Sequence, residues 1–239
     1  MLGLGLGLNK NTNKRQIVRN GLVLYLDGKD FKNSPPTSLW MDRSGLGNNA
    51  TPTGFAYTTA SGSDGVSGVV FDGVDDIATV TNNVNFDFGS GDFTIAFSVN
   101  MNVKNVINSI VCKRYSATSN ASFYIYLGTT TIVFAYSVNG TVSSEITFTK
   151  TLNVNTKYRI LFRRVGTSLK CFVDNILISE TSMGTNVIFT STENMIMGAL
   201  NSSGTKSYFL NGTILNLLTY KGKGLTDSEI ARDYNVMRW

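Results

Sequence analysis

Aspartates gather in the first third of the sequence, close to segments with the composition of turns. Asp72, Asp75 and Asp76 are near neighbours, and Asp27 and Asp42 come before them. Hard cations such as Ca²⁺ take about six to eight oxygen ligands, many of them from carboxylates. Calcium is thus the one cofactor that the sequence admits, with the adjacent Asp75 and Asp76 as the most ligand-like residues. The alternative is structural, because aspartates in Asp-Gly and Asp-x-Ser-Gly turns hydrogen-bond to their own backbone, and we favour it.

Catalytic chemistry finds little support in the residue types. The chain has no histidine, which removes the commonest general base, the serine triad and most zinc sites. A glycosidase needs two carboxyl groups about 5–9.5 Å apart. Glutamate occurs only at positions 145, 180, 193 and 229, too far apart to form a short carboxylate motif on one strand. We therefore expect the protein not to be an enzyme.

Aromatic residues offer a third chemistry, the binding of sugars. Lectin sites combine an aromatic platform with Asn, Asp or backbone donors, and the candidates are Trp40, Tyr57, Tyr115 and Tyr136. Trp40 has an alternative place, packed under the loop that carries Asp42, and tyrosines in alternating strands often belong to a core. A surface rich in Ser, Thr and Asn would suit a glycan, but it equally suits an inert exterior.

The two cysteines, Cys112 and Cys171, lie far apart in strand-like runs, and neither has a second cysteine close by in the sequence. Cysteine in such surroundings behaves as a small apolar residue. We therefore expect both to be buried and unpaired. Without a histidine to activate it, neither is a convincing nucleophile.

Most of the formal net charge of +5 belongs to the N-terminus. Residues 1–20 carry four basic and no acidic side chains; 21 minus these four leaves 17 basic against 16 acidic groups, or +1, for the rest. The same segment has leucines that alternate with glycines, so an extended chain would show leucine along one face. The residues of this arm that we expect to dock on a neighbour are Leu2, Leu4, Leu6, Leu8, Lys10, Lys14, Arg15 and Arg19.

We interpret this arm as a segment that adds to a neighbouring chain as a strand; the alternative is a disordered tail. Docking implies an assembly with other proteins and with further copies of this chain. The nearly neutral remainder has no basic stripe, so we expect no nucleic-acid binding by the folded domain. No apolar run approaches the ~18 residues of a membrane span. The start also places its basic residues after its apolar stretch, unlike a signal peptide, so we expect no membrane partner.

Strands must position most of these residues, because alternation with a period of two dominates the chain from about residue 21 onward. In segment 93–100, large apolar side chains occupy the odd positions and small or polar ones the even positions. Asn139-Gly140 has the sequence of a type I′ hairpin turn, and Asp174-Asn175 that of a second tight turn. The other expected strands cover 22–26, 69–71, 77–80, 107–113, 123–127, 132–137, 145–149, 158–164, 169–173, 176–179, 195–197 and 208–219.

One helix is expected near the C-terminus. Thr226 to Glu229 form a capping box, and Ile230 and Tyr234, four residues apart, would face the sheet. Many short strands closed by one short helix predict an all-β fold, a two-sheet antiparallel jelly-roll sandwich with an extended N-terminal arm. We expect the arm at 1–20 and the sandwich at 21–239.

Six segments in order resemble the laminin-G-like, concanavalin A-like jelly-roll superfamily, and together they cover about residues 21–235. The resemblance implies the same sandwich fold, and calcium at its rim as in many members. The segments are 21–27 (GLVLYLD), 38–51 (SLWMDRSGLGNNAT), 70–76 (VFDGVDD), 93–99 (FTIAFSV), 209–214 (FLNGTI) and 225–230 (LTDSEI).

The arm carries a second resemblance. MLGLGLGL followed by an asparagine-rich stretch is similar to the start of structural proteins in tailed-bacteriophage virions. This implies a non-enzymatic virion subunit, as head decoration, fibre or tail accessory, that is anchored through residues 1–20 to other virion proteins. The alternative is a lectin-like module that recognises host or surface glycans.

Overall fold

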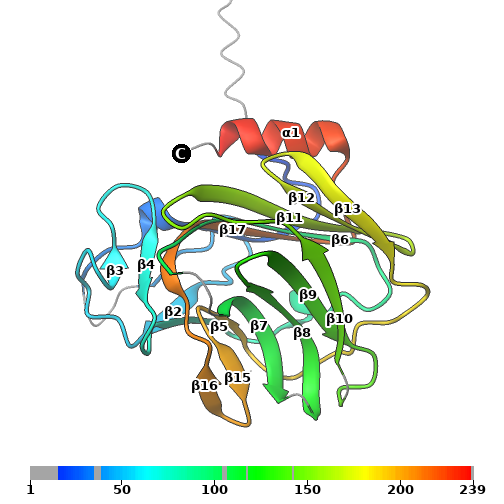
Figure 1. The fold of residues 1–239 in the computed structure, drawn as a ribbon, viewed down its shortest axis with the longest axis horizontal. Helices are drawn as coiled ribbons and strands as arrows, with labels where there is room; N and C mark the ends of the chain where they lie inside the picture. Colours follow the sequence, from blue (N-terminus) through cyan, green and yellow to red (C-terminus); the bar gives the residue numbers. More distant parts are fainter. Residues whose placement is uncertain (1–15, 35–38, 104–106, 117, 142, 238–239) are drawn as a thin grey trace, which may run out of the picture.

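The alternating apolar residues form two antiparallel sheets that stack face to face (Figure 1). In β6 (Phe93–Met101), Phe93, Ile95, Phe97 and Val99 belong to the apolar core between the sheets. The predicted all-β sandwich with one short C-terminal helix is confirmed. The computed structural model describes residues 16–34, 39–103, 107–116, 118–141 and 143–237.

The two sheets contain eight and seven strands. The first runs in the order β13 (Ile176–Ser182), β12 (Ser168–Val173), β11 (Lys157–Val165), β6, β17 (Asn211–Lys221), β4 (Val69–Asp72) and β3 (Gly62–Ser63), with β1 (Leu22–Asp27) also paired to β17. The second runs in the order β10 (Ser143–Thr149), β9 (Thr131–Ser137), β8 (Ser119–Leu127), β7 (Asn108–Ser116), β14 (Met195–Met197), β5 (Ile77–Val80) and β2 (Ala50–Thr53). A hairpin of β15 (Leu200–Ser202) and β16 (Thr205–Ser207) and two 3₁₀ helices, Gly28–Asp30 and Val84–Phe86, complete the described elements.

Phenylalanine rings join the two layers. The ring centroids of Phe93 and Phe134 are 5.6 Å apart, and those of Phe134 and Phe162 are 5.3 Å apart. Phe93 and Phe162 come from the eight-stranded sheet and Phe134 from the seven-stranded one. Because each such pair contributes about 0.5–1.5 kcal/mol beyond its buried area, the sandwich is held by contacts that cross it.

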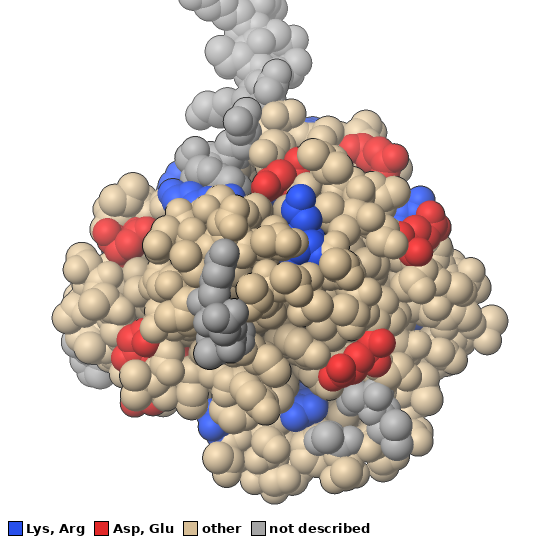
Figure 2. Space-filling model, in the orientation of Figure 1, with Lys and Arg blue, Asp and Glu red and all other residues tan. Residues whose placement is uncertain are grey.

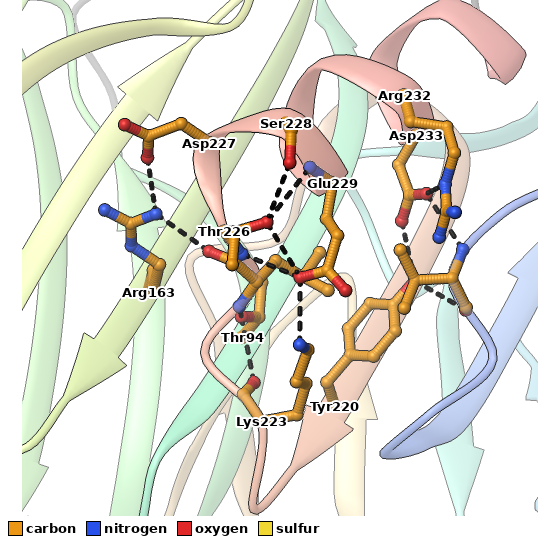
Figure 3. Close-up of polar contacts among 12 residues, drawn as sticks. Thr94, Arg163, Tyr220, Lys223, Thr226, Asp227, Ser228, Glu229, Arg232 and Asp233 are labelled. Carbon is orange, nitrogen blue, oxygen red and sulfur yellow. Dashed lines mark hydrogen bonds and ion pairs between the residues drawn. The ribbon is translucent and has the colours of Figure 1, made fainter.

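The helix α1 (Asp227–Val236) covers the outer face of the eight-stranded sheet. Its expected capping box is confirmed (Figure 3): Thr226 Oγ1 accepts from the Glu229 N–H at 3.3 Å, and Glu229 Oε2 accepts from the Thr226 N–H at 2.8 Å. Ile230 is buried against the sheet, as expected. The helix thus covers part of this outer face and buries the apolar side chains beneath it.

Asp233 is the buried polar residue of α1, and it holds the N-terminal segment against the sandwich (Figure 3). Tyr220 Oη donates to Asp233 Oδ2 at 2.7 Å, and the Val18 N–H donates to Oδ1 at 2.9 Å. Ile17 and Val18 are buried in the same apolar cluster as the helix. Tyr234, which was expected to face inward, is half-buried, whereas Asp233 takes the fully buried position with its two donors.

Residues 17–19, which the sequence analysis assigns to the arm, therefore pack on the sandwich. The Arg19 guanidinium donates to the main-chain oxygen of Arg43 at 2.8 Å, within the same chain. The other expected docking residues lie outside the described residues, so docking stays a prediction. They are Leu2, Leu4, Leu6, Leu8, Lys10, Lys14 and Arg15.

The two expected tight turns behave differently. Asp174 and Asn175 both have positive φ, 50° and 67°, and directly join β12 to β13 as expected. Asn139-Gly140 does lie between paired strands, β9 and β10, but only Gly140 has positive φ. The type I′ assignment was wrong, because the connection is longer than two residues and Ser137 Oγ accepts from the Gly140 N–H at 2.8 Å.

Both cysteines are buried and unpaired, as expected. Burial raises the pKa of the Cys171 thiol to about 12 and raises that of Cys112 as well. A thiol with a raised pKa stays protonated at neutral pH and is a poor nucleophile. Both cysteines therefore act as small apolar residues.

Charged side chains are sparse on the face shown in Figure 2, where a few blue and red groups, some of them next to a group of opposite sign, lie among uncharged residues. Within the described part of the chain, no helix is long and apolar enough to cross a membrane.

Candidate functional site

Three of the predicted metal-binding aspartates meet in the turn between β4 and β5. Asp72, Asp75 and Asp76 each place a carboxylate oxygen within 4.8 Å of the others. Asp76 is buried, and its two oxygens accept from the Asp72 N–H at 2.9 Å and from Ser61 Oγ at 3.0 Å. Burial, together with the charges of Asp72 and Asp75, raises the pKa of Asp76 to about 6. Carboxylates are suitable calcium ligands, but Asp76 already uses both oxygens in the turn, so calcium stays a prediction.

Asp27 and Asp42 do not join this cluster. No group of three close acidic residues in the described chain includes either of them. The Asp42 carboxylate accepts from the main-chain N–H groups of Tyr25, Ser44 and Asn48 at 2.8–2.9 Å. Asp27 accepts from Arg43 at 2.9 Å. These contacts agree with the turn interpretation, in which the aspartates hold the loop after β1.

The predicted aromatic residues do not form one binding surface. Trp40 is fully buried, and its indole Nε1 donates to the main-chain oxygen of Asp27 at 2.8 Å. The expectation that Trp40 contacts a glycan is corrected by this burial, since the ring fills space under the Asp42 loop. Tyr57 stacks on Phe31 with centroids 6.3 Å apart, and Tyr136 is buried. Tyr115 is 40% exposed near the end of β7.

A groove that the sequence analysis did not predict lies on the outer face of the seven-stranded sheet. In β8, Phe123, Ile125 and Leu127 belong to the core, so the intervening Tyr124 and Tyr126 point outward. The β15–β16 hairpin contributes to the wall of a cavity of about 180 Å³. Its lining residues are Ile107, Ser109, Arg114, Tyr124, Tyr126, Glu145, Leu200 and Tyr208.

Two tyrosines and one glutamate form the centre of this groove. The rings of Tyr124 and Tyr126 stack with centroids 6.1 Å apart and planes 15° apart. Tyr124 Oη donates to Glu145 Oε1 at 2.8 Å, and Tyr126 Oη donates to Oε2 at 3.2 Å. Ala135 on β9 pairs with Tyr124 on one side and Glu145 on the other, and its small side chain lets Glu145 reach the hydroxyls. Burial and the charge of Glu145 raise the pKa of Tyr126, so its hydroxyl stays protonated.

A buried arginine forms the other end of the stack. The Arg114 guanidinium carbon lies 4.5 Å from the centroid of the Tyr124 ring. Arg114 Nε donates to the main-chain oxygen of Asn201 at 3.0 Å, and Asn201 Nδ2 donates back to the Arg114 oxygen at 2.9 Å. Lys206 donates to Asn201 Oδ1 at 3.0 Å. The groove therefore combines aromatic rings, a carboxylate and a cation in a small volume.

A second, larger cavity of about 360 Å³ lies on the opposite sheet beside α1. Its charged residues are paired with one another or with the helix: Arg163 with Asp227 at 2.6 Å, and Lys170 with Glu180 at 3.2 Å. Its lining is devoid of aromatic rings. We therefore take the tyrosine groove as the candidate site.

One feature of the groove can be predicted from the sequence. Alternation in the segment 123–127 predicts that Tyr124 and Tyr126 share the face opposite Phe123. It does not indicate that Glu145, 19 residues or more away, lies across them, because this depends on the pairing of β8, β9 and β10.

Comparisons with known proteins agree with this architecture. Residues 72–231 match the family described as the concanavalin A-like lectin/glucanases superfamily. No curated protein matches the chain in sequence.

Solved structures show the same fold. The receptor binding domain of botulinum neurotoxin mosaic serotype C/D aligns over 91% of this chain and 51% of its own, with TM-score 0.65 and 11% identity. A second structure comes from work on botulinum neurotoxin type C, described as showing that its cell entry depends on interaction with two ganglioside molecules. It aligns over 93% of this chain and 52% of its own, with TM-score 0.62 and 16% identity. NanB with Optactamide aligns over 69% and 27%, with TM-score 0.58 and 12% identity. The chain spans about half the length of the two toxin structures, and at these identities the likeness shows the fold alone.

Proposed function

The chain belongs to the concanavalin A-like lectin/glucanases superfamily, and from this premise we propose that it is a lectin-like carbohydrate-binding module. The observation that carries the proposal is the groove in which Tyr124 and Tyr126 share the carboxylate of Glu145. The apolar face of a sugar ring packs on an aromatic ring, and the Glu145 carboxylate fixes the tyrosine rings by accepting from both of their hydroxyls. Sites that bind small ligands combine such apolar walls with a few fixed polar groups.

The similar structures support this proposal over the virion role. One of them is described by the binding of ganglioside molecules, and neither of the other two structures named above is described as a virion protein. The virion role and virion location also depend on the arm, most of which lies outside the described residues. They stay predictions.

The proposed module binds sugar without cleaving it. Glycoside hydrolysis in most families requires two carboxyl groups flanking the bond. Glu145 is the one carboxylate that lines the groove among the residues described. Its two oxygens are also occupied by tyrosine hydroxyls, which supports a role in binding.

The full chain should bind a subset of glycans on an array, and Tyr126→Ala should lower that affinity at least tenfold. The reason is that Tyr126 contributes both an aromatic face and one donor to Glu145. Tyr234→Ala is the matched control, because Tyr234 is half-buried on α1, at the other sheet, and does not line the groove. Equal loss in both variants, or no saturable binding by the unmodified chain, would contradict the proposal.

A further inference from the structure

We infer that the ligand of the tyrosine groove is an acidic saccharide, whose carboxylate or sulfate group is bound by the guanidinium of Arg114. This inference rests on the proposed function, and it adds the chemical class of the sugar. The starting observation is that Glu145 uses both carboxylate oxygens in hydrogen bonds, whereas Arg114 uses only Nε.

Arg114 is nearly buried, with 5% of its surface exposed, yet it has few partners. Its Nε donates to Asn201, and its guanidinium stacks on Tyr124. The two terminal nitrogens make no hydrogen bond or ion pair with the described residues, and they are not among the side-chain atoms sealed from solvent. They therefore open into the groove that Arg114 lines, with donors ready for a ligand.

Glu145 does not fill this role. Its Oε1 and Oε2 each accept from a tyrosine hydroxyl, and no ion pair links it to Arg114 in the described structure. The guanidinium thus has no carboxylate partner among the described residues, whereas the carboxylate is already hydrogen-bonded. Lys206, fixed by Asn201 Oδ1 at 3.0 Å, adds a second cation next to Arg114. Arg114 therefore gives the groove cationic donors, in addition to the neutral hydroxyl of Tyr208.

Guanidinium groups bind carboxylates and sulfate-like anions through two parallel N–H···O bonds. A free anion would use only this end of the groove. Beside it lies the half-buried ring of Tyr126, which suits the apolar face of a ring attached to the acid. Tyr124 is itself buried and stacks between the Arg114 guanidinium and Tyr126. Anion donors and aromatic faces within one cavity of about 180 Å³ fit an acidic sugar better than a free ion or a neutral glycan.

The test is a glycan array that holds matched neutral, carboxylated and sulfated members, followed by calorimetric titration of the full chain. Lactose, 3′-sialyllactose and 3′-sulfolactose provide one such set on a shared backbone, and glucuronate-containing oligosaccharides with their neutral counterparts provide another. We expect at least one acidic member to bind tenfold or more tightly than its neutral partner. Its affinity should fall as salt rises from 50 to 500 mM, because the contact is between charges.

Two substitutions should act in opposite directions. Arg114→Gln should weaken binding of the acidic member at least tenfold and leave neutral members unaffected. Glu145→Gln keeps the shape of the side chain but removes a negative charge near the acid, so acidic members should bind severalfold more tightly. The second variant keeps the test informative if Arg114→Gln fails to fold, and Tyr234→Phe, on α1 at the other sheet, is the control that should change neither.

The outcomes separate the two proposals. Neutral members that bind as well as acidic ones, with no effect of Glu145→Gln, would overturn the acidic ligand and leave the carbohydrate-binding function standing. The absence of saturable binding to any glycan would overturn both. Tighter binding of acidic members that persists in a correctly folded Arg114→Gln would overturn the role of Arg114.

Discussion

Glu145 and Arg114 differ in their hydrogen-bond partners, and this difference is not the one that their solvent exposure would suggest. Glu145 lies on an open face, but its two oxygens are held by tyrosine hydroxyls. Arg114 is buried and has a main-chain carbonyl and a ring for partners. A buried charge without an opposite charge is costly, so the arrangement persists because the groove lets ligand or water reach the guanidinium. The proposed binding capacity therefore lies in the Arg114 donors that make no hydrogen bond within the described residues.

Asp233 shows a different solution for a buried charge. Burial raises its pKa above the ordinary value, and the hydrogen bonds from Tyr220 and Val18 and the nearby charge of Arg159 oppose this effect. The folded protein therefore holds the proton at pH values where the unfolded chain, with an ordinary pKa of about 3.9, has lost it. The stability that this proton contributes is fully present below about pH 4 and is lost as pH rises through the raised pKa of the folded state.

Asp233→Asn should therefore flatten the pH dependence of stability. Asparagine carries no charge at any pH, so the fall in unfolding free energy with rising pH that Asp233 causes should disappear. Urea denaturation between pH 4 and pH 8 measures this. Ser228→Ala, on the same helix and without a titratable side chain, is the control that should keep the wild-type slope. Parallel pH profiles for Asp233→Asn and the wild type would contradict the assignment.

Local sequence rules were enough for individual elements. The alternation in β6 and the capping box of α1 depend on neighbours within a few residues, and both are found where they were expected. The type I′ turn predicted at Asn139-Gly140 was wrong, because turn type depends on where the flanking strands end. Here β9 ends at Ser137 and β10 begins at Ser143. For Trp40 the glycan-contact interpretation was wrong and the alternative, packing under the Asp42 loop, agrees with its burial. The groove could not be predicted locally, since it needs β7, β8, β10 and β15 to meet.

The capping box of α1 gives a prediction at the scale of the element. Thr226→Ala removes the hydroxyl that accepts from the Glu229 N–H, so the free energy of unfolding should fall by about 0.5–2 kcal/mol. Ser228→Ala is the control on the same turn, because Ser228 Oγ contacts only the Thr226 hydroxyl in the described structure. Equal losses in the two variants, measured by urea denaturation, would show that the cap does not stabilise the helix.

The two outer faces of the whole sandwich have different covers. The helix α1 and residues 17–18 cover part of the eight-stranded sheet and bury outward apolar side chains such as Ala96, Leu161 and Leu218. The seven-stranded sheet has the short β15–β16 hairpin as cover for part of its outer face. Its outward tyrosines, Glu145 and Arg114 are therefore left at the edge of a groove. The division of the two faces explains why one sheet stabilises the fold while the other offers a candidate site.

This division makes the position of an N-terminal truncation decisive. A chain that starts at residue 16 keeps every described contact of Ile17 and Val18, and it should unfold at the wild-type denaturant concentration. A chain that starts at residue 21 loses both apolar side chains, at about 1.5–3 kcal/mol each, and leaves Asp233 without its main-chain donor. We expect it to be less stable by roughly 3–6 kcal/mol at most, since the denatured chain also buries some of this surface. Urea denaturation of the two truncations measures the difference. Equal stability would mean that the segment 16–20 is not part of the folded unit, and it would return the boundary of the sandwich to residue 21.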